Sequence, residues 1–152
     1  MVRAQRFEAF FGEVAVRMAG LPVCNPALAV ELRGWQAPAP GVELGVLIAP
    51  WCMSLLWCVD GADWPAKGAP VTLALASGEY EGIAHDEPAL GRYASASLCS
   101  PMDAFADQAG ARAMADEVLR LLLAAPASPA ETGTALSRRG LLRRVLGHEA
   151  PA

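Results

Sequence analysis

Four cysteines are the residues of this chain best suited to metal or redox chemistry. Cys24, Cys52, Cys58 and Cys99 include no C-x-x-C pair, the spacing typical of zinc and iron-sulfur sites. Cys52 and Cys58 are six residues apart, so one strand running through both would place them on the same face. We expect free thiols buried as small apolar core residues. A thiol-based metal or redox factor that uses Cys52, Cys58 or Cys99 stays open as the alternative function.

Two histidines, His85 and His148, are the available imidazole bases. His85 precedes Asp86, which could orient its ring, but a single His-Asp step is more typical of a solvated strand end than of a catalytic triad. The sequence contains no phosphate-cradling glycine loop, no H-E-x-x-H motif and no dinucleotide-binding fingerprint. We therefore expect a protein that is not an enzyme and that carries no cofactor and no metal. A pair of catalytic carboxylates that come together only in the folded protein would not be visible as a sequence motif.

Tryptophans are the side chains best suited to contact a partner, because they combine a large apolar area with a polar N–H and are enriched at binding hot spots. The chain has four, Trp35, Trp51, Trp57 and Trp64. Most tryptophans in a domain of this size lie in the core. Trp51 is the candidate for exposure because it follows Pro50, which lacks an amide donor and interrupts a strand ladder.

An uncharged run, GVLIAPWCMSLLWCV at positions 45–59, must position several of these residues. A membrane-spanning helix needs about 20 predominantly apolar residues. This run is shorter, ends before Asp60 and contains a proline. We therefore expect two buried strands, 42–48 and 52–59, that meet at a bend around the proline.

The overall composition is that of an ordinary soluble protein of one domain. The chain has 152 residues, 18% of them charged, and a net charge of −4. Its N-terminal stretch, MVRAQRFEAFFGEV, carries arginines and glutamates and has no apolar segment followed by a small-residue cleavage site. We expect a cytoplasmic protein without stable membrane insertion.

Hydrophobic periodicity predicts the elements. Phe7, Phe10, Phe11, Val14 and Met18 recur at helical spacing, so a helix is expected over residues 3–19. Alternating apolar residues predict strands over 28–33, 42–48, 52–59, 71–76, 80–85 and 92–98.

A second helix is expected to begin at Ser100-Pro101-Met102-Asp103 and to end at Pro126. The start combines a serine N-cap, a proline at the first helical position and an acid in the first turn. Strands bracketed by two helices predict an α+β fold, in which an antiparallel β-sheet packs with an N-terminal and a C-terminal helix and is covered on one face.

The composition changes after this α+β domain, which we place at residues 1–125. PASPAETGTA cannot bury enough apolar surface to order itself, so residues 126–136 are expected to form a flexible linker. Residues 137–152 carry a charge of +3 and leave −7 on the rest of the chain. An acidic body with a tethered basic tail indicates either self-docking or a partner that takes the tail.

The tail sequence SRRGLLRRVLG predicts an amphipathic helix with leucines and valine on one side and arginines on the rest. Such a helix is typical of a docking peptide. A membrane-surface helix is the alternative, although so short a helix with one weak apolar face would bind lipid only marginally. Nucleic acid is not an expected partner, because the acidic body would repel phosphates.

Four sequence blocks resemble the HybE family of nickel-iron hydrogenase assembly chaperones. They are N-P-A-L-x-V-E at 25–31, L-G-V-L-I-x-P-W-x-M at 44–53, L-G-x-Y at 90–93 and S-L-x-S-P-M-x-x-F-x-D at 97–107. The segment from Ser137 to Leu142 is similar to the twin-arginine segment with which such proteins tend to end. Where this chain has Ala96, family members often have a cysteine, and where it has Cys99 they often have an aromatic residue.

The resemblance implies a cytoplasmic accessory chaperone that is not an enzyme. It would bind a hydrogenase large or small subunit precursor, together with other maturation factors, and help to prevent premature export through the twin-arginine route. The partner-binding residues that the resemblance and the tryptophan argument indicate are Pro50, Trp51, Met53, Tyr93, Ser100, Pro101, Met102, Arg138 and Arg139.

Overall fold

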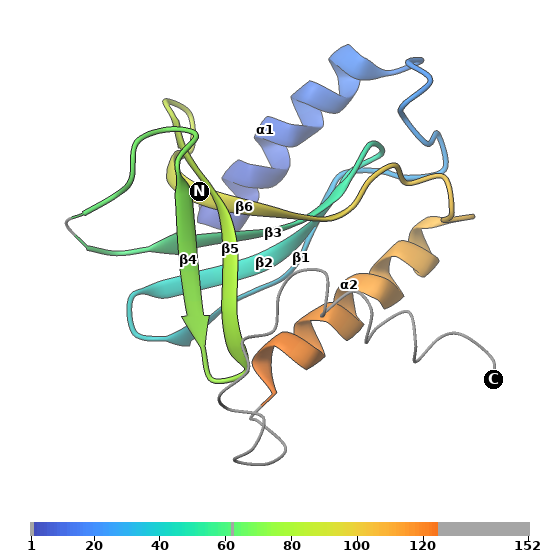
Figure 1. Cartoon of the computed structure of the whole chain (residues 1–152). Coiled ribbons are helices and arrows are strands. Elements are labelled where there is room, and N and C mark those ends of the chain that lie inside the picture. The colour runs from blue at the N-terminus through green and yellow to red at the C-terminus, as the bar shows by residue number, and fades with distance from the viewer. Residues whose placement is uncertain (1, 62, 125–152) are drawn as a thin grey trace.

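A computed structural model describes residues 2–61 and 63–124 of the chain. Its elements are α1 (Arg3–Met18), β1 (Glu31–Ala39), β2 (Val42–Ile48), β3 (Met53–Val59), β4 (Pro70–Leu75), β5 (Gly78–Glu87), β6 (Gly91–Cys99) and α2 (Gln108–Leu123). The strands form one antiparallel sheet in the order β1-β2-β3-β6-β5-β4 (Figure 1). The predicted α+β class, with an antiparallel sheet between an N-terminal and a C-terminal helix, is confirmed.

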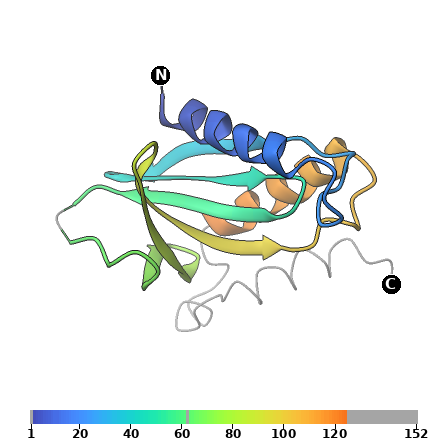
Figure 2. The ribbon, with the colours of Figure 1, turned by 90° about the horizontal axis from the view of Figure 1, so that it is seen from above.

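The two helices cover opposite faces of the sheet, as the view from above shows (Figure 2). On β2 and β3, Leu44, Val46 and Trp57 belong to the cluster packed with α2. Leu47 and Leu56 point the other way, into the cluster around α1. The expectation that only one face is covered is therefore wrong.

This double coverage explains the uncharged run at positions 45–59. A strand buried on both faces has apolar residues at successive positions rather than at alternate ones. The run forms the end of β2, a bend and β3, and the amide of Ala49 donates to the carbonyl of Cys52 at 2.9 Å to close the bend. Among the described residues, no helix combines the length and the apolar character that a membrane span needs.

Strand bounds follow the predictions closely except at the first strand. β1 begins at Glu31 and continues through Pro38 to Ala39, instead of ending before the prolines. Two register shifts interrupt its pairing with β2. Because β1 is an edge strand, a proline there does not remove a hydrogen bond that the sheet needs.

The second helix begins seven residues later than predicted. α2 starts at Gln108, and the side chain of Asp107 caps it by accepting a hydrogen bond from the amide of Gly110 at 2.9 Å. The segment 100–107 is a loop because Met102 is buried in the core and its carbonyl accepts a hydrogen bond from Asn25. The start signals at Ser100 to Asp103 were overridden by this tertiary contact.

We expect Gly82→Ala to lower the free energy of unfolding by roughly 2–3 kcal/mol. A Cβ atom at Gly82 would lie 2.4 Å from Cη2 of the fully buried Trp57 and 2.6 Å from the carbonyl oxygen of Ser95. Denaturant unfolding measures the effect. The matched control is Gly12→Ala in α1, where nothing lies within 4 Å of the added atom. That variant should gain about 0.5–1 kcal/mol, and equal stability of the two variants would contradict the packing argument.

Candidate partner-binding surface

One asparagine joins three segments at one end of the sheet. The backbone amide of Asn25 donates to the carbonyl of Pro50 at 2.9 Å. Its side-chain Nδ2 donates to the carbonyls of Met102 at 3.0 Å and Phe105 at 2.8 Å. Asn25 therefore fixes residues 20–30, 49–52 and 100–107 relative to one another, and we refer to these three segments as the loop end.

Local turn chemistry orients Asn25 for this task. Its Oδ1 accepts a hydrogen bond from the amide of Ala27 at 2.9 Å, and its carbonyl accepts one from the amide of Leu28 at 3.1 Å. An asparagine before a proline favours such a turn. Leu28 is buried in the core, so the turn is anchored and the two amide hydrogens of Asn25 face the 100–107 loop.

The structure brings six of the predicted binding residues together at or beside the loop end. Trp51 is half-buried, and its carbonyl accepts a hydrogen bond from Oγ of Ser100 at 3.5 Å. Ser100 and Pro101 are exposed, whereas Pro50 is buried. A partner can therefore reach Trp51, Ser100 and Pro101 directly.

Met53 and Met102 belong to the core beneath this surface. Both are 0% exposed, and both pack in the cluster that contains α2. They support the bend and the 100–107 loop from inside. Partner binding by these residues stays a prediction, and their burial gives them an indirect role in it.

Tyr93 lies apart from the other predicted residues. It is buried on the α1 face of the sheet, where its ring is 5.1 Å from that of Phe7 and stacks on His85 at 4.6 Å. Burial, and to a smaller extent the charges of Glu87 and Cys58, raise the pKa of Tyr93 to about 12. Tyr93 is thus a neutral core side chain. The remaining two predicted residues, Arg138 and Arg139, lie outside the described residues, as do the predicted linker and tail.

An apolar groove that sequence reasoning missed opens beside the loop end. It encloses about 670 Å³ between the second half of α1, the 20–30 segment and Pro50. The small residues Gly12 and Ala15 of α1 line it, together with Val16 and Leu21, which remain 78% and 48% exposed. Val16 is an apolar residue that lies outside the helical stripe from which the core face of α1 was predicted. This misplaced apolar residue is the one signal in the sequence that could have indicated the groove.

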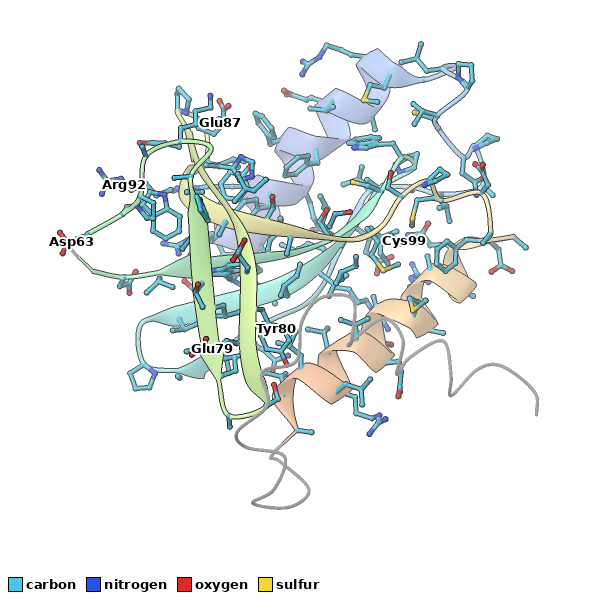
Figure 3. The ribbon with its side chains drawn as sticks, viewed as in Figure 1. Asp63, Glu79, Tyr80, Glu87, Arg92 and Cys99 are labelled. Atoms are coloured by element: carbon cyan, nitrogen blue, oxygen red, sulfur yellow. The ribbon has the colours of Figure 1, made fainter. Side chains whose placement is uncertain are left out.

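The thiols are divided between the two ends of the sheet. Cys99, which Figure 3 labels, lies next to the loop end, and Cys52 interacts with it. Cys58 is at the other end of β3, roughly 20 Å along the strand from Cys52. Burial raises the pKa of all three thiols, which lowers the fraction of reactive thiolate. Within residues 2–61 and 63–124, no three histidine, cysteine or acidic side chains form a group that could hold a metal ion. A thiol pair would therefore have to consist of Cys52 and Cys99, with Cys58 apart from both.

His85 is not paired with the acid that follows it in the sequence. Successive side chains on β5 point to opposite faces. Nε2 of His85 is hydrogen-bonded to Oγ of Ser95 at 2.7 Å, whereas Asp86 lies 3.8 Å from Nε of Arg92. Burial, with a smaller contribution from the charge of Lys67, lowers the pKa of His85. The ring is a neutral, hydrogen-bonded part of the sheet surface.

Comparison with known proteins gives consistent matches along the chain. Residues 2–144 match the family model described as "NiFe-hydrogenase assembly, chaperone, HybE". The hydrogenase expression/formation protein HupT of Azotobacter chroococcum is 57% identical over 146 residues, which cover 94% of this chain and 95% of that protein. HoxT of Azotobacter vinelandii is 54% identical over 147 residues, with the same coverage. The solution structure of HybE from Escherichia coli has the same fold, with a TM-score of 0.65 at 22% identity over 82% of this chain and 78% of that one.

We expect Asn25→Ala to cost about 2–3 kcal/mol of stability, because two loop carbonyls lose their donor. Asn25→Asp should cost at least as much. Its carboxylate could still accept the hydrogen bond from Ala27 but could not donate to Met102 and Phe105. Denaturant unfolding of both variants measures the cost. An aspartate variant as stable as the unaltered protein would show that the turn matters and the two donated bonds do not.

Proposed function

Because the chain belongs to the HybE family of NiFe-hydrogenase assembly chaperones, we propose that it binds the precursor of a hydrogenase large or small subunit in the cytoplasm during maturation. It acts by binding and not by catalysis. The observation that carries the proposal is the apolar groove beside the loop end, with exposed aliphatic side chains along α1 and the 20–30 segment.

The groove has the chemistry of a site for apolar side chains of an unfinished polypeptide. Glycine and alanine among its lining residues let a large side chain approach the α1 backbone closely, and nothing lies within 4 Å of where a Cβ atom of Gly12 would be. Val16, Leu21 and the 42%-exposed Val23 supply apolar surface around it. Burying about 100 Å² of such surface contributes roughly 2.5 kcal/mol, so a few anchors suffice for a transient complex that releases its client when the client folds.

Trp51, Ser100 and Pro101 extend this surface with a flat, partly polar area. The indole of Trp51 is half-buried, so part of its ring is available without any movement of the bend. Hot spots of binding surfaces are enriched in tryptophan. In the proposed complex the precursor lies across the groove and reaches the 100–107 loop. Other maturation factors are further proposed partners.

We propose further that the tail helps to prevent premature export. Residues 137–142 resemble a twin-arginine export signal, and the tail's positive charge opposes the negative charge of the body. By imitating that signal or competing with it, the tail would delay recognition of the precursor by the export machinery until the subunit is complete.

We expect Val16→Asp and Leu21→Asp to reduce capture of the precursor at least about tenfold, because a carboxylate would be buried in the apolar contact. Capture of the large and the small subunit precursor by tagged variants, with folding checked by circular dichroism, measures this. Val59→Asp is the matched control, since Val59 is 41% exposed at the far end of β3. Undiminished capture of both precursors by folded groove variants would sink the proposal.

Trp51→Ala tests the extended surface. Met102→Ala does not, because it would open a cavity in the core.

We expect deletion of residues 137–152 to leave precursor capture intact and to advance export. The capture surface lies in the described part of the chain, whereas the proposed export delay needs Arg138 and Arg139. Pulse-chase labelling of the precursor in cells, with fractionation across the membrane, measures when export begins. Substituting both arginines by lysine retains the charge and controls for electrostatics alone. Unchanged export timing after the deletion would remove the tail from the mechanism.

A further inference from the structure

Among the described residues, no strand pairs with the outer edge of β4. β4 is the last strand in the sheet order (Figure 1), and its sequence, PVTLAL, contains no charged residue. The amide of Ala84 donates to the carbonyl of Ala69 at 2.9 Å. In an antiparallel ladder every second residue of a strand bonds to the same neighbouring strand. Counting from Ala69, the residues of β4 that bond to β5 are therefore Val71, Leu73 and Leu75. The backbone N–H and C=O groups of Thr72 and Ala74 point away from β5. Both residues are exposed.

The opposite edge is closed by devices that natural sheets use against strand addition. β1 contains Pro38 and two register shifts. At its start, the side chain of Gln108 binds both the amide and the carbonyl of Ala29, and Arg112 pairs with Glu31 at 2.8 Å. β4 is less protected: it has a proline only at its first residue, no register shift interrupts its pairing with β5, and no described side chain is hydrogen-bonded to Thr72 or Ala74.

The two faces beside β4 differ in chemistry. Glu81 stands opposite Thr72 and Glu79 opposite Ala74, and both carboxylates are exposed. Neither forms an ion pair within the described part of the chain. Figure 3 shows Glu79 and the buried Tyr80 on opposite sides of the hairpin. On the Tyr80 side, the half-buried Val71 and Leu75 pack against the core beside α2.

We propose that the β4 edge binds an extended segment of a partner polypeptide in which apolar residues alternate with arginine or lysine. The segment adds a seventh strand by bonding to Thr72 and Ala74, in the manner of β-strand addition. Its apolar side chains extend the core beside Val71 and Leu75. Its basic side chains cross the short side chains of β4 to Glu79 and Glu81, two strand spacings or roughly 9.5 Å away.

A second copy of this chain and the chain's own tail are the two other candidate occupants of the β4 edge. Charge and sequence pattern favour a partner chain over both. A second copy pairing through its own β4 would leave the two sets of Glu79 and Glu81 three strand spacings apart, roughly 14 Å, and its uncharged β4 would supply no basic side chain to either set. The chain's own tail, RRGLLRRVLG, does not alternate apolar and basic residues with a period of two. The edge and the loop end lie on different sides of the molecule, as the labels of Glu79 and Cys99 in Figure 3 indicate, so the proposal stands apart from the groove.

The test uses the full chain labelled with ¹⁵N and the capped peptide acetyl-Val-Arg-Val-Lys-Val-Arg-Val-amide as probe. We expect the peptide to shift the amide signals of Thr72 and Ala74 and those of the neighbouring β5 residues. Thr72→Pro should weaken binding at least about tenfold, because it removes an outward donor while leaving the bonds to β5 intact. Thr72→Val is the matched control and should bind as the unaltered protein does. The same peptide with alternate amides N-methylated should not bind.

Replacing Glu79 and Glu81 by glutamine should weaken binding several-fold at low salt and flatten its salt dependence. Four results would overturn the proposal. Two are equal affinity of the Thr72→Pro variant and shifts confined to the groove beside α1. The third is tighter peptide binding after deletion of residues 125–152, which would make the tail the occupant, and the fourth is a concentration-dependent dimer that Thr72→Pro abolishes, which would make a second copy the occupant.

Discussion

The hydrogen bonds by which Asn25 joins its own segment to the 49–52 bend and to the 100–107 loop are the constraint on which this end of the molecule depends. Its amide nitrogen donates to two carbonyls of the 100–107 loop, and its backbone donates to the bend before β3. Backbone carbonyls in a loop against the core must be satisfied, and a single asparagine satisfies three of them here. The sequence of residues 100–103 favours a helix start, and the hydrogen bonds from Asn25 stabilise the loop conformation instead.

The core leaves little of the sheet free for function. Two helices cover opposite faces of its first strands, so β2 and β3 are buried on both sides. The groove beside α1, the loop end and the β4 edge remain accessible in the part of the chain that the structure describes. The groove offers contacts to side chains, whereas the edge offers contacts to a main chain. An unfinished polypeptide exposes both kinds of group, and a protein that assists assembly benefits from surfaces that recognise each of them.

The cysteines and the histidine considered for chemistry lie at separate places on the sheet. Burial raises the pKa of Cys52, Cys58 and Cys99, and β3 separates Cys58 from the other two. His85 bonds to Ser95, and its sequence neighbour Asp86 faces away from it. These side chains contribute packing and hydrogen bonds to the sheet, and this arrangement agrees with the family's role in assembly.

The sequence by itself determined the elements and the class of the fold, because period-two and period-3.6 patterns report local geometry that each segment adopts wherever it is placed. The bend at Pro50 and the uncharged run through β2 and β3 were visible in this way. It also supplied the four blocks that resemble the family. Only the tertiary structure decided that both sheet faces are covered, that the 100–107 segment is a loop, and that Met53 and Met102 are buried beneath Trp51 and Pro101. It alone located the groove and the open β4 edge. Those features depend on contacts between residues up to 80 positions apart, such as Asn25 and Phe105, and no local pattern encodes which distant segment will supply a donor, a covering helix or a neighbouring strand.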